Sequence, residues 1–140
     1  MSRPQNLVME RRGAAALVIL NRPDVRNALN YDLISETEEA LHGLNKNDDC
    51  RAIVLTGSGE RAFCAGMDLD LVRNLDADTS TDWLVRLKGL YEAIRWLKKP
   101  IVAAVNGAAA GAGYQLALLS DLRVGHAKAS MGQPEINVGL

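Results

Sequence analysis

A stretch without charge, residues 101–120, constrains the fold of this chain more than any other feature. It opens with five apolar residues, Ile101 to Val105, directly after Pro100. A proline disfavours helix at the residue before it, and a short run that is apolar throughout is typical of a strand buried on both faces. Asn106-Gly107 is a turn signal, and residues with little side-chain bulk follow it. The pattern predicts a strand, a turn and then a helix that begins near Ala112.

The small residues of this stretch indicate a binding function. Because Ala108 to Gly113 carry almost no side-chain bulk, a ligand can approach the backbone closely there. The start of a helix presents unpaired N–H groups and the positive end of the helix dipole. Together these properties favour a site for a negatively charged oxygen.

Three other interpretations of the stretch stay open. Its length without charge is that of a transmembrane helix, and Gly107 and Gly111 match GxxxG, but the three glycines and Gln115 leave it weakly hydrophobic. Gly111-x-Gly113 after a strand is also the beginning of a dinucleotide-binding fingerprint, although Leu116 occupies the place of the third glycine. The third interpretation is purely structural, because close packing of a helix on a sheet also needs small residues.

Composition excludes several classes of partner. The chain has 140 residues, 48% of them hydrophobic, and a net charge of −1, which suits one globular domain over residues 1–140. Without a basic excess we expect no nucleic acid and no membrane surface as partner, and the N-terminus lacks the pattern of a signal peptide. Cys50 and Cys64 lack CxxC spacing, so we expect free thiols in a cytoplasmic protein. His42 and His126 are isolated, so we expect structural or surface roles for them and no metal site.

The rest of the chain predicts alternating strands and helices. We expect strands over residues 7–10, 14–20, 51–56 and 121–124, and helices that begin near Asn30 or Asp32, near Met67 and near Asp82. The last of these helices should run to Lys99 with its aromatic residues, Trp83 and Tyr91, in the core. The acidic residues 76–82 should form a mobile loop. This order of elements predicts an α/β fold whose parallel strands are joined by helical crossovers.

A second segment has the same character as the first. Gly66-Met67 also follows a strand and a run of small residues, as Gly111-Ala112 does. Two converging N–H donors form an oxyanion hole, which stabilises a developing enolate or alkoxide. Glu135, in the turn over residues 131–135, would supply a carboxylate for proton transfer.

These segments resemble, in order along the chain, the motifs of the crotonase superfamily, also called the enoyl-CoA hydratase/isomerase family. The matching segments are residues 21–23, 27–29, 63–69, 99–107, 111–113 and 132–135. The resemblance implies a spiral of ββα units of the ClpP/crotonase type and acyl-CoA thioester substrates. It also implies a homotrimer or hexamer, and no cofactor apart from the coenzyme A that is part of the substrate.

The resemblance further implies roles for individual residues. The backbone amides of Met67 and Ala112 would hold the thioester oxygen, and Glu135 and Gln115 would occupy the two catalytic side-chain positions. The residues implied in coenzyme A binding are Arg26, Ala65, Gly66, Asp68 and Leu69.

Two departures from the family pattern affect the expected function. Hydratases of the family carry two glutamates, whereas here the first position is Gln115 and only the second, Glu135, is acidic. A neutral amide can orient a water molecule but cannot exchange a proton at neutral pH, so the sequence favours an isomerase that works with one carboxylate. There are two alternative functions, an enoyl-CoA hydratase and a catalytically silent CoA-binding or oligomerisation module. The Gln115 side chain could also simply face solvent and have no catalytic role. The resemblance covers about the first half of a typical family domain, so we expect an N-terminal portion that lacks the C-terminal part.

Overall fold

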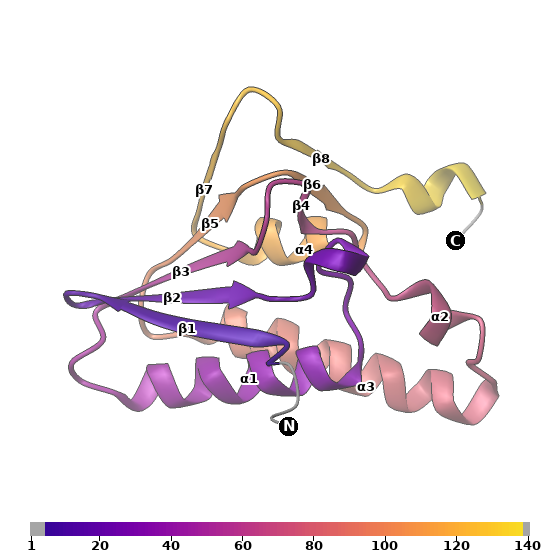
Figure 1. The fold of residues 1–140 in the computed structure, drawn as a ribbon. Coiled ribbons are helices and arrows are strands. Elements are labelled where there is room, and N and C mark those ends of the chain that lie inside the picture. The colour runs from indigo at the N-terminus through magenta and orange to yellow at the C-terminus, as the bar shows by residue number, and fades with distance from the viewer. Residues whose placement is uncertain (1–4, 139–140) are drawn as a thin grey trace.

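The computed structural model describes residues 5–138, which form two sheets with helices packed against them (Figure 1). The larger sheet has the strand order β1-β2-β3-β5-β7, in which β1 and β2 form an antiparallel hairpin and the other neighbours are parallel. The smaller, parallel sheet has the order β4-β6-β8. The strands span Leu7–Arg12 (β1), Ala15–Leu20 (β2), Ala52–Gly57 (β3), Ala62–Cys64 (β4), Ile101–Val105 (β5), Ala108–Ala110 (β6), Leu122–Gly125 (β7) and Ser130–Gly132 (β8).

The chain repeats one pattern after the first helix, α1 (Tyr31–Lys46). A strand of the larger sheet is followed by a strand of the smaller sheet and then by one or more helices. The units are β3-β4 with α2 (Leu69–Val72) and α3 (Ala77–Arg95), β5-β6 with α4 (Ala112–Leu119), and β7-β8 with the 3₁₀ helix η2 (Pro134–Val138). This is the ββα spiral that the sequence motifs imply.

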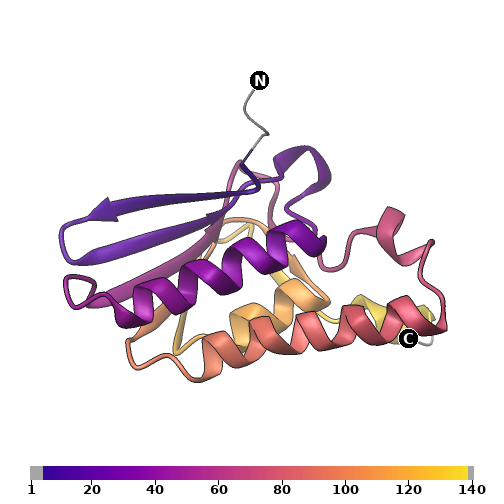
Figure 2. The same ribbon diagram turned by 90° about the horizontal axis from the view of Figure 1, so that it is seen from below.

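Helices α1 (Tyr31–Lys46) and α3 lie side by side beneath the larger sheet (Figures 1 and 2). Asn30 caps α1, because its side chain accepts a hydrogen bond from the Leu33 amide. Helix α1 turns its apolar stripe toward β1 and β2, and α3 packs against α1 and α4. In strands β2, β3 and β5, buried residues alternate with partly exposed ones, so one face of the sheet lies in the core. The largest buried side chains of this core are Leu20, Leu29, Leu33, Ile34, Leu41, Ile53, Leu55, Phe63, Trp83, Leu90, Ile101 and Leu116.

Helix α3 begins earlier and ends earlier than the sequence pattern predicts. The acidic residues 76–82 are not a mobile loop: Asp76 is the N-cap, and it forms a reciprocal capping box with Thr79. Asp82 therefore lies inside the helix, where it pairs with Arg86 at 2.9 Å. The helix ends at Arg95, four residues before Lys99.

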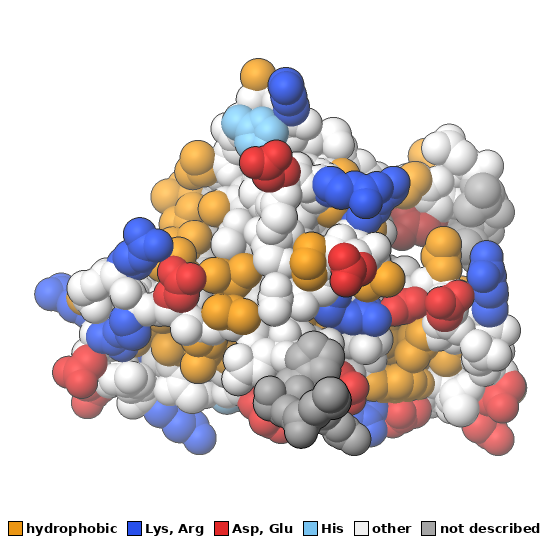
Figure 3. All heavy atoms as spheres, viewed as in Figure 1, with side chains coloured by type: hydrophobic (Ala, Val, Ile, Leu, Met, Phe, Trp, Pro, Cys, Tyr) orange, Lys and Arg blue, Asp and Glu red, His pale blue; other side chains and the backbone are white. Residues whose placement is uncertain are grey.

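The short elements also differ from the predictions. Strands β4, β6 and β8 have three residues each. Three residues are too few to show the alternation of apolar and polar residues that indicates a strand, so the sequence predicts none of them. Residues 101–120, the candidate membrane span, instead form β5, β6 and the whole of α4. Within residues 5–138, no helix has both the length and the apolar character needed to cross a membrane. On the face shown in Figure 3, basic and acidic side chains are interspersed and form no basic patch.

Candidate active site

Two segments with N–H donors meet where β4 and β6 end. Gly66 and Gly111 both have positive φ, +96° and +53°, a conformation that favours glycine. A Cβ atom on Gly66 would lie 2.9 Å from the carbonyl oxygen of Ala110 and 3.6 Å from the nitrogen of Ala112. The two segments can touch because Gly66 has no side chain to hold them apart.

The amides of Met67 and Ala112 are the donors that this contact brings together. Ala112 is the first residue of α4, so its N–H has no acceptor within the helix. Met67 forms an isolated bridge with Leu29, but the amides bonded there belong to Leu29 and Asp68. Within the described part of the chain, neither donor amide has a backbone acceptor, so both are available to a ligand oxygen.

The prediction of two helix starts is confirmed at Ala112 and wrong at Met67. Helix α2 begins two residues after Met67, at Leu69, and Asp68 caps it. Because α2 is a single turn, its dipole contributes little to a site at Met67. The bridge to Leu29, and not a helix, sets the direction of that amide.

Glu135 on η2 lies against Gly111, one residue before the Ala112 amide. A Cβ atom on Gly111 would be only 1.9 Å from Oε1 of Glu135, so the carboxylate occupies the space of the missing side chain. The Gly111 amide donates to the carbonyl of Gly132 at 3.1 Å, which ties the start of α4 to the segment before η2. Oε2 of Glu135 is buried and has no hydrogen-bond partner among the described residues. An orphaned buried oxygen is costly, and it is typical of a group retained for chemistry.

Gln115 is half-buried and does not simply face solvent. Its Oε1 accepts a hydrogen bond from the hydroxyl of Tyr91, and its Nε2 lies 3.5 Å from Oε1 of Gln133, two residues before Glu135. The predicted core residue Tyr91 is therefore a polar neighbour of the site. Its position among the apolar residues of α3 concealed this role.

Burial keeps two acidic groups near the site protonated. It raises the pKa of the Cys64 thiol at the end of β4 to about 12, against a smaller opposite effect of a hydrogen bond from the Gly66 backbone. Burial also raises the pKa of Tyr91 well above its usual range, and the charge of the Glu135 carboxylate adds to the effect. Both groups are neutral at physiological pH.

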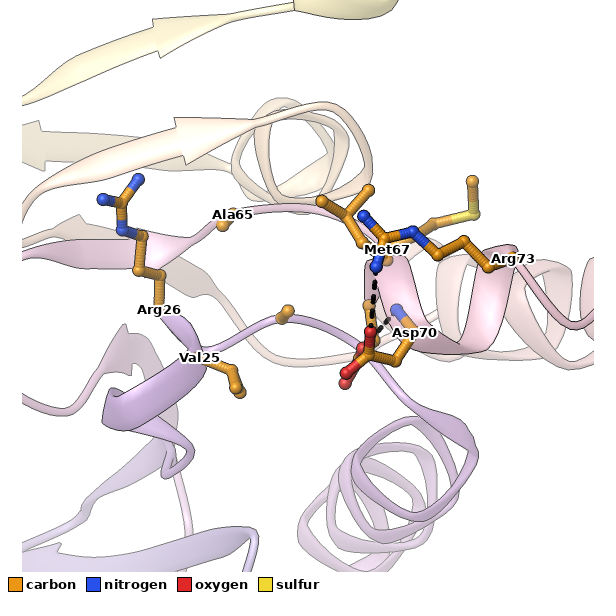
Figure 4. A pocket seen from close by; sticks show the side chains of 9 residues that line it. Val25, Arg26, Ala65, Met67, Asp70 and Arg73 are labelled. Carbon is orange, nitrogen blue, oxygen red and sulfur yellow. Dashed lines mark hydrogen bonds and ion pairs between the residues drawn. The ribbon is translucent and has the colours of Figure 1, made fainter.

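A pocket of about 460 Å³ adjoins the Met67 amide (Figure 4). Five of the predicted site residues line it: Arg26, Ala65, Met67, Asp68 and Leu69. Gly66 is not among the lining residues, and its backbone lies against the Ala110 carbonyl instead. Arg73, which the sequence analysis missed, lies across the pocket from Arg26 in Figure 4 and pairs with Asp70 at 3.4 Å.

Asp68 is held in an ion pair and is not a free anion of the pocket. Its Oδ2 lies 2.8 Å from a guanidinium nitrogen of Arg22, and both side chains are largely buried. The same nitrogen donates to the carbonyl of Ala28 at 2.6 Å. Arg22 therefore ties Asp68 to the segment that forms the opposite wall of the pocket.

Two asparagines in the family-like motifs hold the loop between β3 and β4. The side-chain nitrogen of Asn27, which is 1% exposed, donates to the carbonyl of Ala62 at 2.9 Å. Asn106 donates to the carbonyl of Gly59 at 2.8 Å and accepts from the Gly57 amide at 3.0 Å. These bonds fix the corner that precedes β4 and therefore the position of the Met67 segment.

The two histidines lie on the surface, as expected from the sequence. His42 is 3.6 Å from Glu38 on the same helix, and the ring of His126 is 3.2 Å from the carbonyl of Asn106. Both cysteines are free and buried. Over residues 5–138, no three or more His, Cys, Asp or Glu side chains gather as a metal site would require.

A sequence model of the family described as enoyl-CoA hydratase/isomerase matches residues 10–140. The chain belongs to the enoyl-CoA hydratase/isomerase family. The crystal structure of an enoyl-CoA hydratase from Bacillus anthracis has a TM-score of 0.94 and 31% identity, over 97% of this chain and 53% of that one. An enoyl-CoA hydratase from Thermoplasma volcanium has a TM-score of 0.89 and 32% identity, over 96% and 54%. The crotonase fold is thus confirmed, and it replaces the dinucleotide-binding interpretation of Gly111-x-Gly113.

Curated members of the enoyl-CoA hydratase/isomerase family are similar over most of this chain. It is 34% identical to a crotonyl-CoA hydratase of Syntrophomonas wolfei, over 97% of the chain and 52% of the relative. It is 42% identical to a probable enoyl-CoA hydratase of Rhodobacter capsulatus, over 89% of the chain and 48% of the relative. The chain therefore spans about half the length of these relatives.

Proposed function

We propose that this chain binds an acyl-CoA thioester and stabilises the enolate that forms when the α-proton leaves. One observation carries the proposal: the Met67 and Ala112 segments meet beside the Glu135 carboxylate, whose Oε2 is buried and unpartnered in the described structure. Two N–H donors on one thioester oxygen stabilise the negative charge that develops there. A carboxylate next to them can accept the α-proton and return it.

We infer that the adjoining pocket receives the coenzyme A part of the substrate. Arg26 and Arg73 provide two cations for phosphate groups, which guanidinium groups bind well. Ala65 and Leu69 offer apolar surface beside the Met67 amide. Asp68 would serve to frame this pocket, since Arg22 already neutralises it.

The residues favour a reaction that needs one proton carrier. In a double-bond shift, Glu135 would take a proton from C2 of a 3-enoyl thioester and return it to C4. Hydration requires in addition a group that activates water, and Gln115 is neutral and already accepts a hydrogen bond from Tyr91. Isomerisation is therefore our first candidate. Hydration is the second, because the relatives from Syntrophomonas wolfei and Clostridium acetobutylicum are named as hydratases.

The test uses the natural gene product that contains this sequence. Hydration of 2-enoyl-CoA is measured by loss of the conjugated thioester absorbance. The double-bond shift is measured with 3-enoyl-CoA as substrate, and α-proton exchange is measured in D₂O. We expect exchange or a double-bond shift with slow hydration. Glu135→Gln should abolish all of these activities. Gln115→Glu should raise hydration about 10- to 1000-fold, because it adds a general base.

Other outcomes would favour one of the other two candidate functions, the hydratase or the silent CoA-binding module. Efficient hydration by the unmodified protein that does not change in Gln115→Glu would favour the hydratase. A rise in melting temperature with coenzyme A, but not with NAD or NADP, together with no turnover of any enoyl-CoA, would favour a silent CoA-binding module.

A further inference from the structure

Gln115 is held between side chains from two other elements. Its Oε1 accepts from the Tyr91 hydroxyl of α3, and its Nε2 faces Oε1 of Gln133 at 3.5 Å, next to η2. A carboxamide has one donor end and one acceptor end, so a donor on one side decides which end faces the other side. The contact with Tyr91 therefore controls what Gln115 offers to the site.

The direction of the bond follows from what the Tyr91 hydroxyl can reach. The ring is partly buried, and among the described residues Oε1 of Gln115 is the one hydrogen-bond acceptor for this hydroxyl. A buried hydroxyl without an acceptor would be costly. The phenol also keeps its proton, since burial and the charge of Glu135 both raise its pKa. Tyr91 is thus a permanent donor to Gln115.

We propose that Tyr91 is a positioning residue that holds the amide of Gln115 with Nε2 toward Gln133 and the Glu135 segment. At the position where the family pattern has its first glutamate, the site then presents an N–H donor. Such a donor can bind an oxygen of the substrate or of water but cannot take a proton from it. This role rests on the proposed acyl-CoA function, because it assumes that substrate lies beside Glu135.

The test is a double-mutant cycle in the natural gene product, with Tyr91→Phe, Gln115→Met and the two combined. Tyr91→Phe should lower kcat for α-proton exchange about fivefold, the effect of one neutral hydrogen bond, and leave KM within about twofold. In the Gln115→Met background, Tyr91→Phe should have no further effect on kcat. Equal losses of kcat in both backgrounds would mean that Tyr91 acts through packing, and the proposal would be overturned.

Tyr114→Phe is the matched control. Tyr114 is also half-buried and lies next to Gln115 on α4, but its hydroxyl makes no hydrogen bond within the described residues. This substitution should leave kcat and KM unchanged. A loss of kcat equal to that of Tyr91→Phe would show that any tyrosine near α4 has the effect, and would contradict the proposal.

Melting temperatures of the unmodified protein, Tyr91→Phe, Gln115→Met and the double variant separate the role of Tyr91 from the proposed acyl-CoA function. Coupling between Tyr91 and Gln115 in melting temperature, without turnover of any enoyl-CoA, would support the bond and overturn the proposed function. Turnover without coupling in kcat would support the proposed function and overturn the role of Tyr91. Coupling in both quantities is the result we expect.

Discussion

At the scale of single residues, Gly111 decides where the carboxylate lies. The space that a side chain would occupy there is filled by Oε1 of Glu135. The family-like GxG motif indicated a close approach at this position, but it did not indicate that the approaching group belongs to this chain. The geometry predicts that even one methyl group should separate the carboxylate from the Ala112 amide.

Gly111→Ala should therefore abolish most of the activity. The new Cβ would lie 1.9 Å from Oε1 of Glu135, so the carboxylate must move. A displacement of about 1 Å can cost about 100-fold in rate. We expect α-proton exchange by the natural gene product to fall by at least this factor, while coenzyme A still raises the melting temperature.

Gly13→Ala controls for backbone strain in this experiment. Gly13 has a similar φ, +61°, and nothing lies within 4 Å of its Cβ position. Both substitutions should cost stability, because a side chain is strained at positive φ. Gly111→Ala should cost more, since its ψ of −123° lies outside the left-handed helical region. Only Gly111→Ala should lose exchange activity. Equal activities of the two variants would contradict the placement of Glu135.

At the scale of elements, the start of α4 carries one of the two proposed donors. Ala112 is its first residue, a position that tolerates proline because the N–H there has no helical acceptor. Ala112→Pro should therefore keep the fold and remove one donor. We expect kcat for α-proton exchange to fall about 100-fold or more.

The matched control is Ala77→Pro, at the first position of α3. The preceding residue, Asp76, is extended, with φ −111° and ψ −172°, as a residue before proline should be. Circular dichroism should show both variants folded, with normal kcat in Ala77→Pro alone. Comparable kcat for Ala112→Pro and the unmodified protein would rule out the amide at position 112 as a donor.

At the scale of the whole molecule, apolar side chains are exposed at and beside the edge strand β7. Leu122 and Val124, on alternate residues of β7, are 63% and 61% exposed, and Leu118 near the end of α4 is 50% exposed. An edge strand also presents unpaired N–H and C=O groups, and an exposed apolar patch favours association. This surface is therefore prone to self-association.

We expect the 140-residue chain on its own to associate. Size-exclusion chromatography should show oligomers or aggregates, and the pair Leu122→Lys with Val124→Lys should reduce them. The control pair is Leu84→Lys with Val85→Lys, which adds the same charge at exposed apolar residues of α3 and should have less effect. A sharp monomer peak with fixed near-UV circular dichroism would contradict this prediction.

Local signals predicted much of the fold. The cap Asn30, the run from Ile101 to Val105 and the start of α4 at Ala112 were confirmed, because each depends on neighbours in the sequence. The capping box of Asp76 and Thr79 is also visible in the sequence, but the acidic composition of this segment favours a loop. Strands β4, β6 and β8 were not predictable, since a segment of three residues forms a strand only when distant strands pair with it.

The sequence by itself determined the family and the small residues that leave backbone amides open to a ligand. Only the tertiary structure decided which of these groups meet. Gly66 contacts Ala112 because β4 and β6 pair in the smaller sheet, and Glu135 reaches Gly111 because β8 joins that sheet. Tyr91 meets Gln115 across 24 residues of chain because α3 and α4 pack together. Composition and spacing record what each segment can form alone, whereas these contacts depend on the packing of segments that are far apart in the sequence.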